Sequence, residues 1–149
     1  GVEVGLQNEL DGEPVLAEVA YFEGLEAQER EAGNEAAMRF DESVRLAQGP
    51  GAQDVLGLAI TRRAALPGGS AAEAEAVLER VGRRMAHSAR LESDYWLYRA
   101  TGDRALLERA YALLNEERDH SPEEFRESMI ANVALHRAIV AALEGQTPT

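Results

Sequence analysis

The sequence predicts an all-α fold, namely a right-handed α-solenoid of about three helical hairpins closed by a C-terminal capping helix. One spacing pattern, in which the second position lies four residues after the first and the third lies three residues later, recurs at offsets of 38 and 33 residues. Its three copies are Ala36, Phe40 and Ser43, then Ala74, Leu78 and Val81, then Leu107, Tyr111 and Leu114. Periods of roughly 20 to 50 residues indicate stacked repeats, and about 34 residues is the length of a helical pair. Alternating β-branched runs are missing and the connections are short, so no strands are expected.

The first hairpin is expected from Pro14 to about Gln48. Residues 1–13 are short, acidic and interrupted by Gly, which is typical of a flexible lead-in, and Pro14 suits the first turn of a helix. An apolar series at helical spacing follows, made of Val15, Val19, Phe22 and Leu25. Gly24 predicts a close approach by a neighbouring helix, because Gly inside a helix costs about 0.5 to 1 kcal/mol. Gly33-Asn34 predicts the helix end, and a second helix is expected over about 35–48.

A second hairpin is expected from about Ala52 to Val81. Its first helix, about 52–66, should bury Val55, Leu58 and Ile60 or Ala59, and expose Arg62 and Arg63. Ser70, with Glu73 three residues later, predicts a capping box at the start of the next helix. Whether that helix continues through Gly82 to Ser88 is open from local propensity, and the repeat period favours a turn near Met85 to Ser88.

The last helices are expected over about 89–100 and 104–118, separated by the turn Thr101-Gly102-Asp103. Leu106, Leu107, Ala110, Tyr111 and Leu114 should form the inner stripe of the second of these. Ser121-Pro122 then starts a further helix that either continues or kinks at Asn132. The chain is thus divided into a lead-in of residues 1–13, one helical repeat domain of residues 14–144, and a tail of residues 145–149.

The composition limits the classes of partner. The formal charge is −12, and all 15 basic residues are Arg. Such acidity argues against nucleic acid and anionic membranes, which both recruit basic side chains. Residues 1–42 hold 12 acids and 2 Arg, hence −10, so any charged partner of this third should be basic. The absence of Cys, of a signal peptide and of a long apolar run makes a cytoplasmic location the expectation.

The residues that carry chemistry do not assemble into a catalytic site in the sequence. His87, His120 and His136 lack the spacing of metal ligands, and the acids near His120 are explained as a helix end. Pro67-Gly68-Gly69-Ser70 lacks the Lys of a phosphate loop. We therefore expect no catalytic residues, no metal and no cofactor.

The helical spacing resembles that of a tetratricopeptide repeat array. Gly24, Ala36, Phe40 and Ser43 match the small, small, aromatic and small positions of one repeat, and Tyr95 to Leu114 match another more loosely. Residues 95–139 resemble the closing segment of repeat arrays in large bacterial signalling proteins with an ATPase module. The resemblance implies a regulatory or scaffolding segment that recruits a protein partner.

Six residues are the candidates for contact with that partner: Arg62, Arg63, Arg83, Arg84, Arg90 and Trp96. The arginines make residues 62–90 locally +3, which suits an acidic peptide, the acidic first hairpin or a neighbouring copy. Trp96 is expected either to be an exposed anchor in a binding groove between the helices or to be buried under the terminal helix. The favoured function is a non-catalytic interaction module that binds a peptide or partner helix in a helical groove. The alternative is a segment that regulates an ATPase or protein kinase in cis, and a homodimer through residues 15–48 is a further expectation.

Overall fold

The computed structural model describes residues 2–120 and 133–145, and every regular element in these two ranges is helical. The α-helices are α1 (Val2–Glu29), α2 (Gly33–Leu46), α3 (Gln53–Ala64), α4 (Ala71–Val81), α5 (His87–Thr101), α6 (Arg104–His120) and α8 (Val133–Leu143). A short 3₁₀ helix, η1 (Gly82–Arg84), follows α4. The all-α class expected from the sequence is thereby confirmed.

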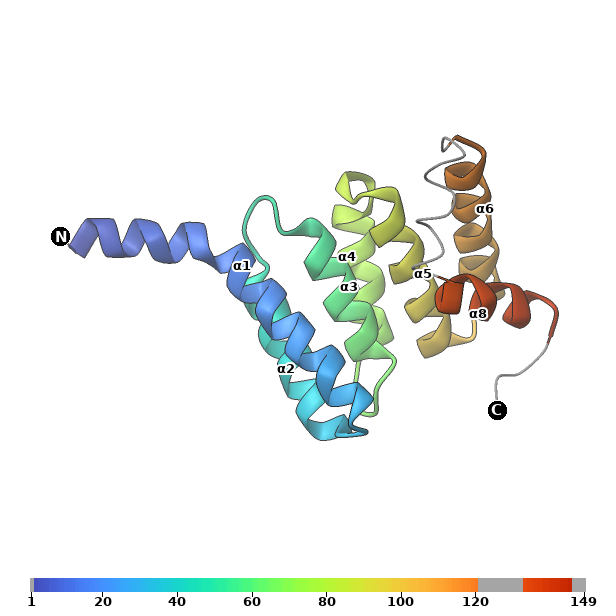
Figure 1. The fold of residues 1–149 in the computed structure, drawn as a ribbon, viewed down its shortest axis with the longest axis horizontal. Helices are drawn as coiled ribbons and strands as arrows, with labels where there is room; N and C mark the ends of the chain where they lie inside the picture. The colour runs from blue at the N-terminus through green and yellow to red at the C-terminus, as the bar shows by residue number, and fades with distance from the viewer. Residues whose placement is uncertain (1, 121–132, 146–149) are drawn as a thin grey trace.

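Consecutive helices pack side by side across the molecule (Figure 1). The first half of α1 extends away from the body, its second half pairs with α2, and α3 and α4 lie next to this pair. Helix α5 packs against both α3 and α6, and α8 contacts α6. No helix within the described ranges is both long enough and apolar enough to cross a membrane.

The start and end of the first helix differ from expectation. The helix begins at Val2 and holds Pro14 inside it, whereas the sequence predicted a start at Pro14. It ends at Glu29, and Glu31 adopts a left-handed φ of 58° in the turn. Gly33, expected to stop the first helix, instead begins α2. The division of the chain into lead-in, domain and tail stays a prediction.

Glycines permit two close contacts on the backbones of α1 and α3. A Cβ added to Gly24 would lie 2.5 Å from Cε1 of the Phe40 ring, which confirms the predicted close approach. Gly57 lies 33 residues later on α3 and also permits a close contact, because an added Cβ would lie 2.5 Å from Cε of Met85. At both glycines a large side chain therefore rests on a helix backbone where a Cβ would not fit.

The expected turn after α4 is also present. Met85 and Ala86 have extended backbone angles, so α4 and α5 are separate helices. The Ala86 amide donates to Oδ1 of Asp54 at 2.9 Å, which fixes the start of α5 against α3. Ser70 accepts a hydrogen bond from the Glu73 amide at 3.2 Å, as one half of the predicted capping box requires. The proposed kink at Asn132 lies outside the described residues.

Two apolar cores share α5. The larger one joins α1 to α5 and includes Phe40, Leu78 and Leu97. The smaller one joins α5, α6 and α8 and includes Tyr95 and Ile139. Helix α5 can serve both cores because its buried residues lie on two sides of the helix.

The burial of several apolar residues differs from the sequence pattern. Val15, Val19 and Phe22 are exposed, although they follow the apolar spacing of α1. Tyr111, expected in the inner stripe of α6, is 39% exposed. Leu58 is only partly buried, while its neighbours Val55, Leu56, Ala59 and Ile60 are buried.

One carboxylate is buried in the second half of the molecule. Asp94 is completely buried and accepts two hydrogen bonds from Arg109, from Nε at 2.9 Å and from Nη2 at 2.7 Å. Arg90, one helical turn earlier, donates to the same carboxylate at 3.2 Å. These bonds supply the partners that a buried charge requires, and they tie α5 to α6.

Candidate binding pocket between α3, α5 and α8

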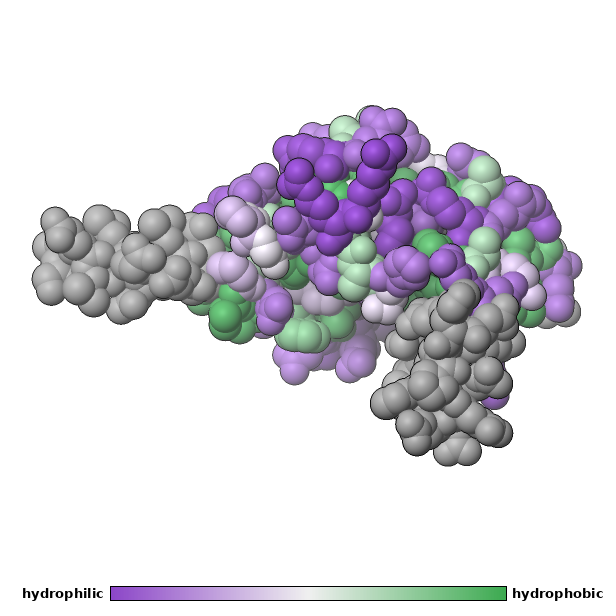
Figure 2. Space-filling view, turned by 90° about the horizontal axis from the view of Figure 1, so that it is seen from above, coloured by the Kyte–Doolittle hydropathy of each residue, from purple (hydrophilic) through white to green (hydrophobic). Residues whose placement is uncertain are grey.

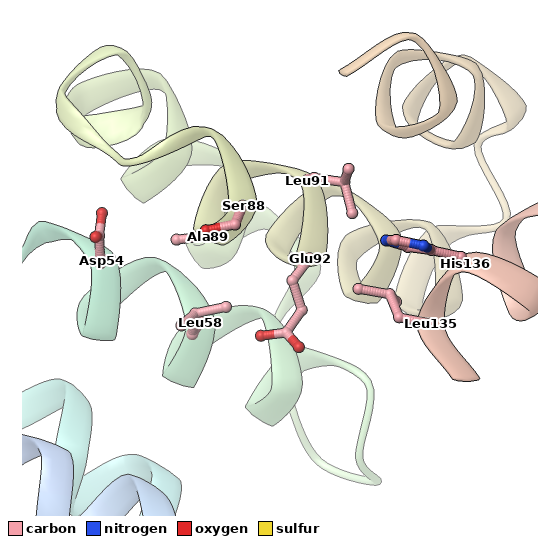
Figure 3. Close-up of a pocket in the computed structure, with 8 residues that line it drawn as sticks. All are labelled: Asp54, Leu58, Ser88, Ala89, Leu91, Glu92, Leu135 and His136. Carbon is pink, nitrogen blue, oxygen red and sulfur yellow. The ribbon is translucent and has the colours of Figure 1, made fainter. Parts of the chain in front are cut away.

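A pocket of about 320 Å³ lies where α3, α5 and α8 meet (Figure 3). Its lining residues are Asp54, Leu58, Ser88, Ala89, Leu91, Glu92, Leu135 and His136. Helix α5 supplies four of them. Positions 88 and 89 lie one helical turn before positions 91 and 92, so all four side chains are on the same side of the helix. The pocket is thus built by three helices that are far apart in the sequence.

The pocket has an apolar wall and several polar groups. Leu58, Leu91 and Leu135 come from the three different helices, and Figure 3 shows Glu92 extending from α5 towards α3 between Leu58 and Leu135. His136 lies beside Leu135 on α8, and Asp54 stands at the other end on α3. Such a mixture of aliphatic wall and a few polar groups is typical of sites that bind a side chain or small ligand.

Behind Glu92, Arg62 connects three helices. Its Nη1 donates to Oε1 of Gln28 at 2.9 Å, and its Nη2 lies 3.9 Å from Oε1 of Glu92. The guanidinium carbon also lies 4.3 Å from the centroid of the Trp96 ring and 5.9 Å from that of Tyr21. Because Arg62 contacts α1 and α5 from its position on α3, it holds the polar wall of the pocket in place.

The environment changes the pKa of two acids in this cluster. Burial raises the pKa of Glu92, while the positive charge of Arg62 and a hydrogen bond with Tyr21 lower it to a smaller extent. Burial likewise raises the pKa of Tyr21 to about 12, against the opposing effect of Arg62. Tyr21, Arg62 and Glu92 are therefore ionisable groups that the fold partly shields from water.

The arrangement offers contacts for a ligand, and its polar groups already have structural partners. Asp54 holds the Ala86 amide, and Glu92 is held by Arg62 and Tyr21. No group of three His, Asp or Glu side chains within the described ranges could hold a metal ion. Of the possible metal ligands near His120, Glu116 is exposed on α6. The side chains of His120, Glu117 and Glu124 lie outside those that the structure describes. The pocket is consequently suited to bind a side chain between its leucines and carboxylates.

The six predicted contact residues lie at several different places. Arg62 and Trp96 come together beside the pocket, and Trp96 is partly buried against the core formed with α8. Arg63 points to the first hairpin, where its Nε lies 3.0 Å from Oδ1 of Asp41. Arg90 is held by Asp94, and Arg83 and Arg84 are exposed in η1. They do not form one basic surface.

The expected exposure of Arg62 and Arg63 is wrong, since their side chains are only 16% and 19% exposed. Their long aliphatic stems lie along apolar surface while their guanidinium groups reach acceptors. For Arg63 this acceptor belongs to the acidic first hairpin, which is one of the pairings considered from the sequence.

Sequence reasoning missed Glu92, Tyr21 and Gln28. A signal was present, because Glu92, Trp96 and Arg99 follow each other at the four- and three-residue spacing of one helix face. Tyr21 and Gln28 are likewise seven residues apart on α1. Only the packing of α1, α3 and α5 shows that these two faces meet at Arg62.

No family model, no curated protein and no solved structure matches this chain.

Proposed function

We propose that this chain is a non-catalytic protein–protein interaction module that binds a peptide or a partner helix in the groove between α3, α5 and α8. The observation that carries the proposal is the pocket of about 320 Å³, in which leucines from all three helices stand beside Glu92. Three helices that present one aliphatic wall and a few fixed polar groups match the way in which helical repeats hold a peptide. A right-handed, tetratricopeptide-like arrangement of the hairpins is part of this proposal.

The groups around the pocket support binding more than catalysis. A general acid or base must be able to reach a substrate proton. Glu92, the acid with a raised pKa, is already engaged by Arg62 and Tyr21. Its role in the proposal is to receive a backbone amide or a basic side chain of the partner.

The test is peptide selection against the intact chain, followed by measurement of affinity. Ser88 lines the pocket and is exposed at the start of α5, so Ser88→Trp fills the hollow with little effect on the core. We expect peptides selected on the wild-type chain to bind Ser88→Trp about tenfold more weakly or worse. Isothermal titration calorimetry gives the affinities.

The matched control is Ala72→Trp, which places the same large side chain at an exposed position of α4 outside the pocket. It should keep the affinity of the wild-type chain. Selected peptides that bind Ser88→Trp as tightly as the wild type would show that the pocket is not the binding site, and failure to select any peptide would argue against the function itself.

A further inference from the structure

The exposed side of α1 carries an apolar stripe made of Val15, Val19 and Phe22. Their exposed fractions are 60%, 48% and 59%, and their spacing of four and three residues places them on one side of the helix. The opposite side of α1 is buried against α2, where Ser43 donates to the Ala17 carbonyl oxygen at 2.8 Å. Figure 2 shows hydrophobic atoms gathered beside the grey N-terminal segment, whereas the centre of the same view is mostly hydrophilic.

The repeat shows what kind of element such a stripe normally meets. The same 33-residue offset that relates Gly24 to Gly57 relates Val19 to Ala52 and Phe22 to Val55. Ala52, directly before α3, is 2% exposed and Val55 of α3 is 8% exposed, because the first hairpin packs against α3. Gln48, the counterpart of Val15, is exposed in the turn after α2. Val19 and Phe22 are thus the counterparts of positions that helices cover in the second hairpin, so a helix is a fitting occupant for this part of the stripe.

The charge around the stripe defines the chemistry of that helix. Glu18, Glu26 and Glu29 are exposed on α1, and residues 1–29 contain no Lys or Arg. Arg30, the next basic residue in the sequence, lies 3.2 Å from Glu35 in an ion pair, and Arg39 of α2 lies 3.6 Å from Glu23 of α1. An incoming helix therefore meets apolar side chains bordered by carboxylates.

These observations point to one occupant: we infer that the stripe docks an amphipathic helix of a partner protein whose polar side is basic. Its apolar side chains cover Val15, Val19 and Phe22, and its Lys or Arg side chains lie beside Glu18 and Glu26. A second copy of this chain fits less well, since residues 1–42 carry −10 in each copy and two such surfaces repel each other. This surface is separate from the pocket between α3, α5 and α8.

The probe for this inference is a pair of labelled synthetic helical peptides with the same leucine face, one with Lys and one with Glu on the polar face. Fluorescence anisotropy with the intact chain should show the Lys peptide binding at least about tenfold more tightly than the Glu peptide, with an affinity that falls as salt rises. Equal affinity for the two peptides would overturn the inference.

Two variants place the binding on the stripe. Val19→Ser combined with Phe22→Ser should weaken binding of the Lys peptide about tenfold, since two exposed apolar contacts are lost. Met38→Ser is the control, because Met38 on α2 is 57% exposed and lies outside the stripe. Unchanged binding by the double variant, or equal loss with Met38→Ser, would contradict the assignment.

Light scattering of the unbound chain at low and high salt tests the competing occupant. A wild-type dimer that the Val19→Ser and Phe22→Ser variant converts to a monomer would show that a second copy covers the stripe, and would overturn the inference. Ser88→Trp should bind the Lys peptide as the wild type does, so failure at this surface and failure of the pocket are distinguishable.

Discussion

Arg62 of α3 contacts both α1 and α5. It reaches Gln28 on α1, and it lies against Glu92 and Trp96 on α5. A guanidinium can do this because it is planar, has several donors and also stacks on aromatic rings. The sequence identified Arg62 and Trp96 separately, and the fold places them 4.3 Å apart.

Tyr21, next to Arg62, gives a pH-dependent test of this cluster. Its pKa is about 12 in the folded chain against an ordinary value of 10.0. As the pH rises from 10 to 12, the unfolded chain loses this proton first, so the folded state binds more protons and the free energy of unfolding falls. We expect Tyr21 to account for a loss of about 2 kcal/mol over this range.

Tyr21→Phe should therefore show a smaller decrease in unfolding free energy between pH 9 and 12 than the wild type in urea titrations. Tyr111→Phe is the control, because Tyr111 is 39% exposed and keeps its contact with water. If Tyr21→Phe and the wild type lose stability in parallel, the phenol of Tyr21 does not have the environment described here.

Among the helices, the contact between α1 and α2 depends on a residue without a side chain. The Phe40 ring occupies the space that a Cβ at Gly24 would need. Such a Cβ would lie only 2.5 Å from Cε1 of Phe40. Gly24→Ala should destabilise the chain by about 1 to 3 kcal/mol, because the ring must move within a packed core. Thermal or urea unfolding measures the loss.

Gly33→Ala is the matched control for this contact. Gly33 begins α2, and a Cβ added there meets nothing within 4 Å. Because Ala also favours the helix and restricts the unfolded chain, this substitution should be neutral or slightly stabilising. Equal destabilisation by both substitutions would show that the loss does not come from the Phe40 contact.

In the whole molecule, α5 links two cores, and the second of them depends on α8. Ile139 of α8 is completely buried in the smaller core with Leu91, Tyr95 and Leu107. Ile139→Ala should cost about 2 to 4 kcal/mol, since it removes several methyl groups from a packed site. Hydrogen exchange should become faster in α6 and α8 and stay unchanged in α1 and α2, because packing is mainly between neighbours.

Val140→Ala provides the control at the adjacent position, where the side chain is 37% exposed. Its effect should stay below about 1 kcal/mol. Faster exchange in α1 and α2 on Ile139→Ala would show that the two cores unfold as one unit.

Local sequence signals predicted the helices well. Ser70, Gly102 and the repeated triplets indicated the caps, the turns and the order of the elements, because these depend on residues close together in the chain. The turn between α4 and α5 also followed from the repeat period. The helix that was expected to start at Pro14 instead starts at Val2 and contains Pro14. A Pro residue that suits the first turn of a helix can thus also lie inside one.

The orientation of each helix was less predictable. Val15, Val19 and Phe22 have the spacing of a core stripe and yet lie on the exposed side, while the small residues Ala17, Ala20, Gly24 and Ala27 are buried. Small residues permit close approach of two helices, and periodicity in hydrophobicity does not reveal this preference. The exposure of Tyr111 was also not predicted, because its spacing in the sequence suited either side of the helix.

The sequence by itself determined the helical class and the acidity of the first third, because these depend on composition and on neighbours along the chain. The tertiary structure alone decided that Tyr21, Gln28, Arg62, Glu92 and Trp96 meet in one cluster. It also decided that Val15, Val19 and Phe22 of α1 face outwards. The physical reason is that burial depends on which surfaces of distant helices fit together. The sequence of a single helix does not specify the surface of the helix that packs against it.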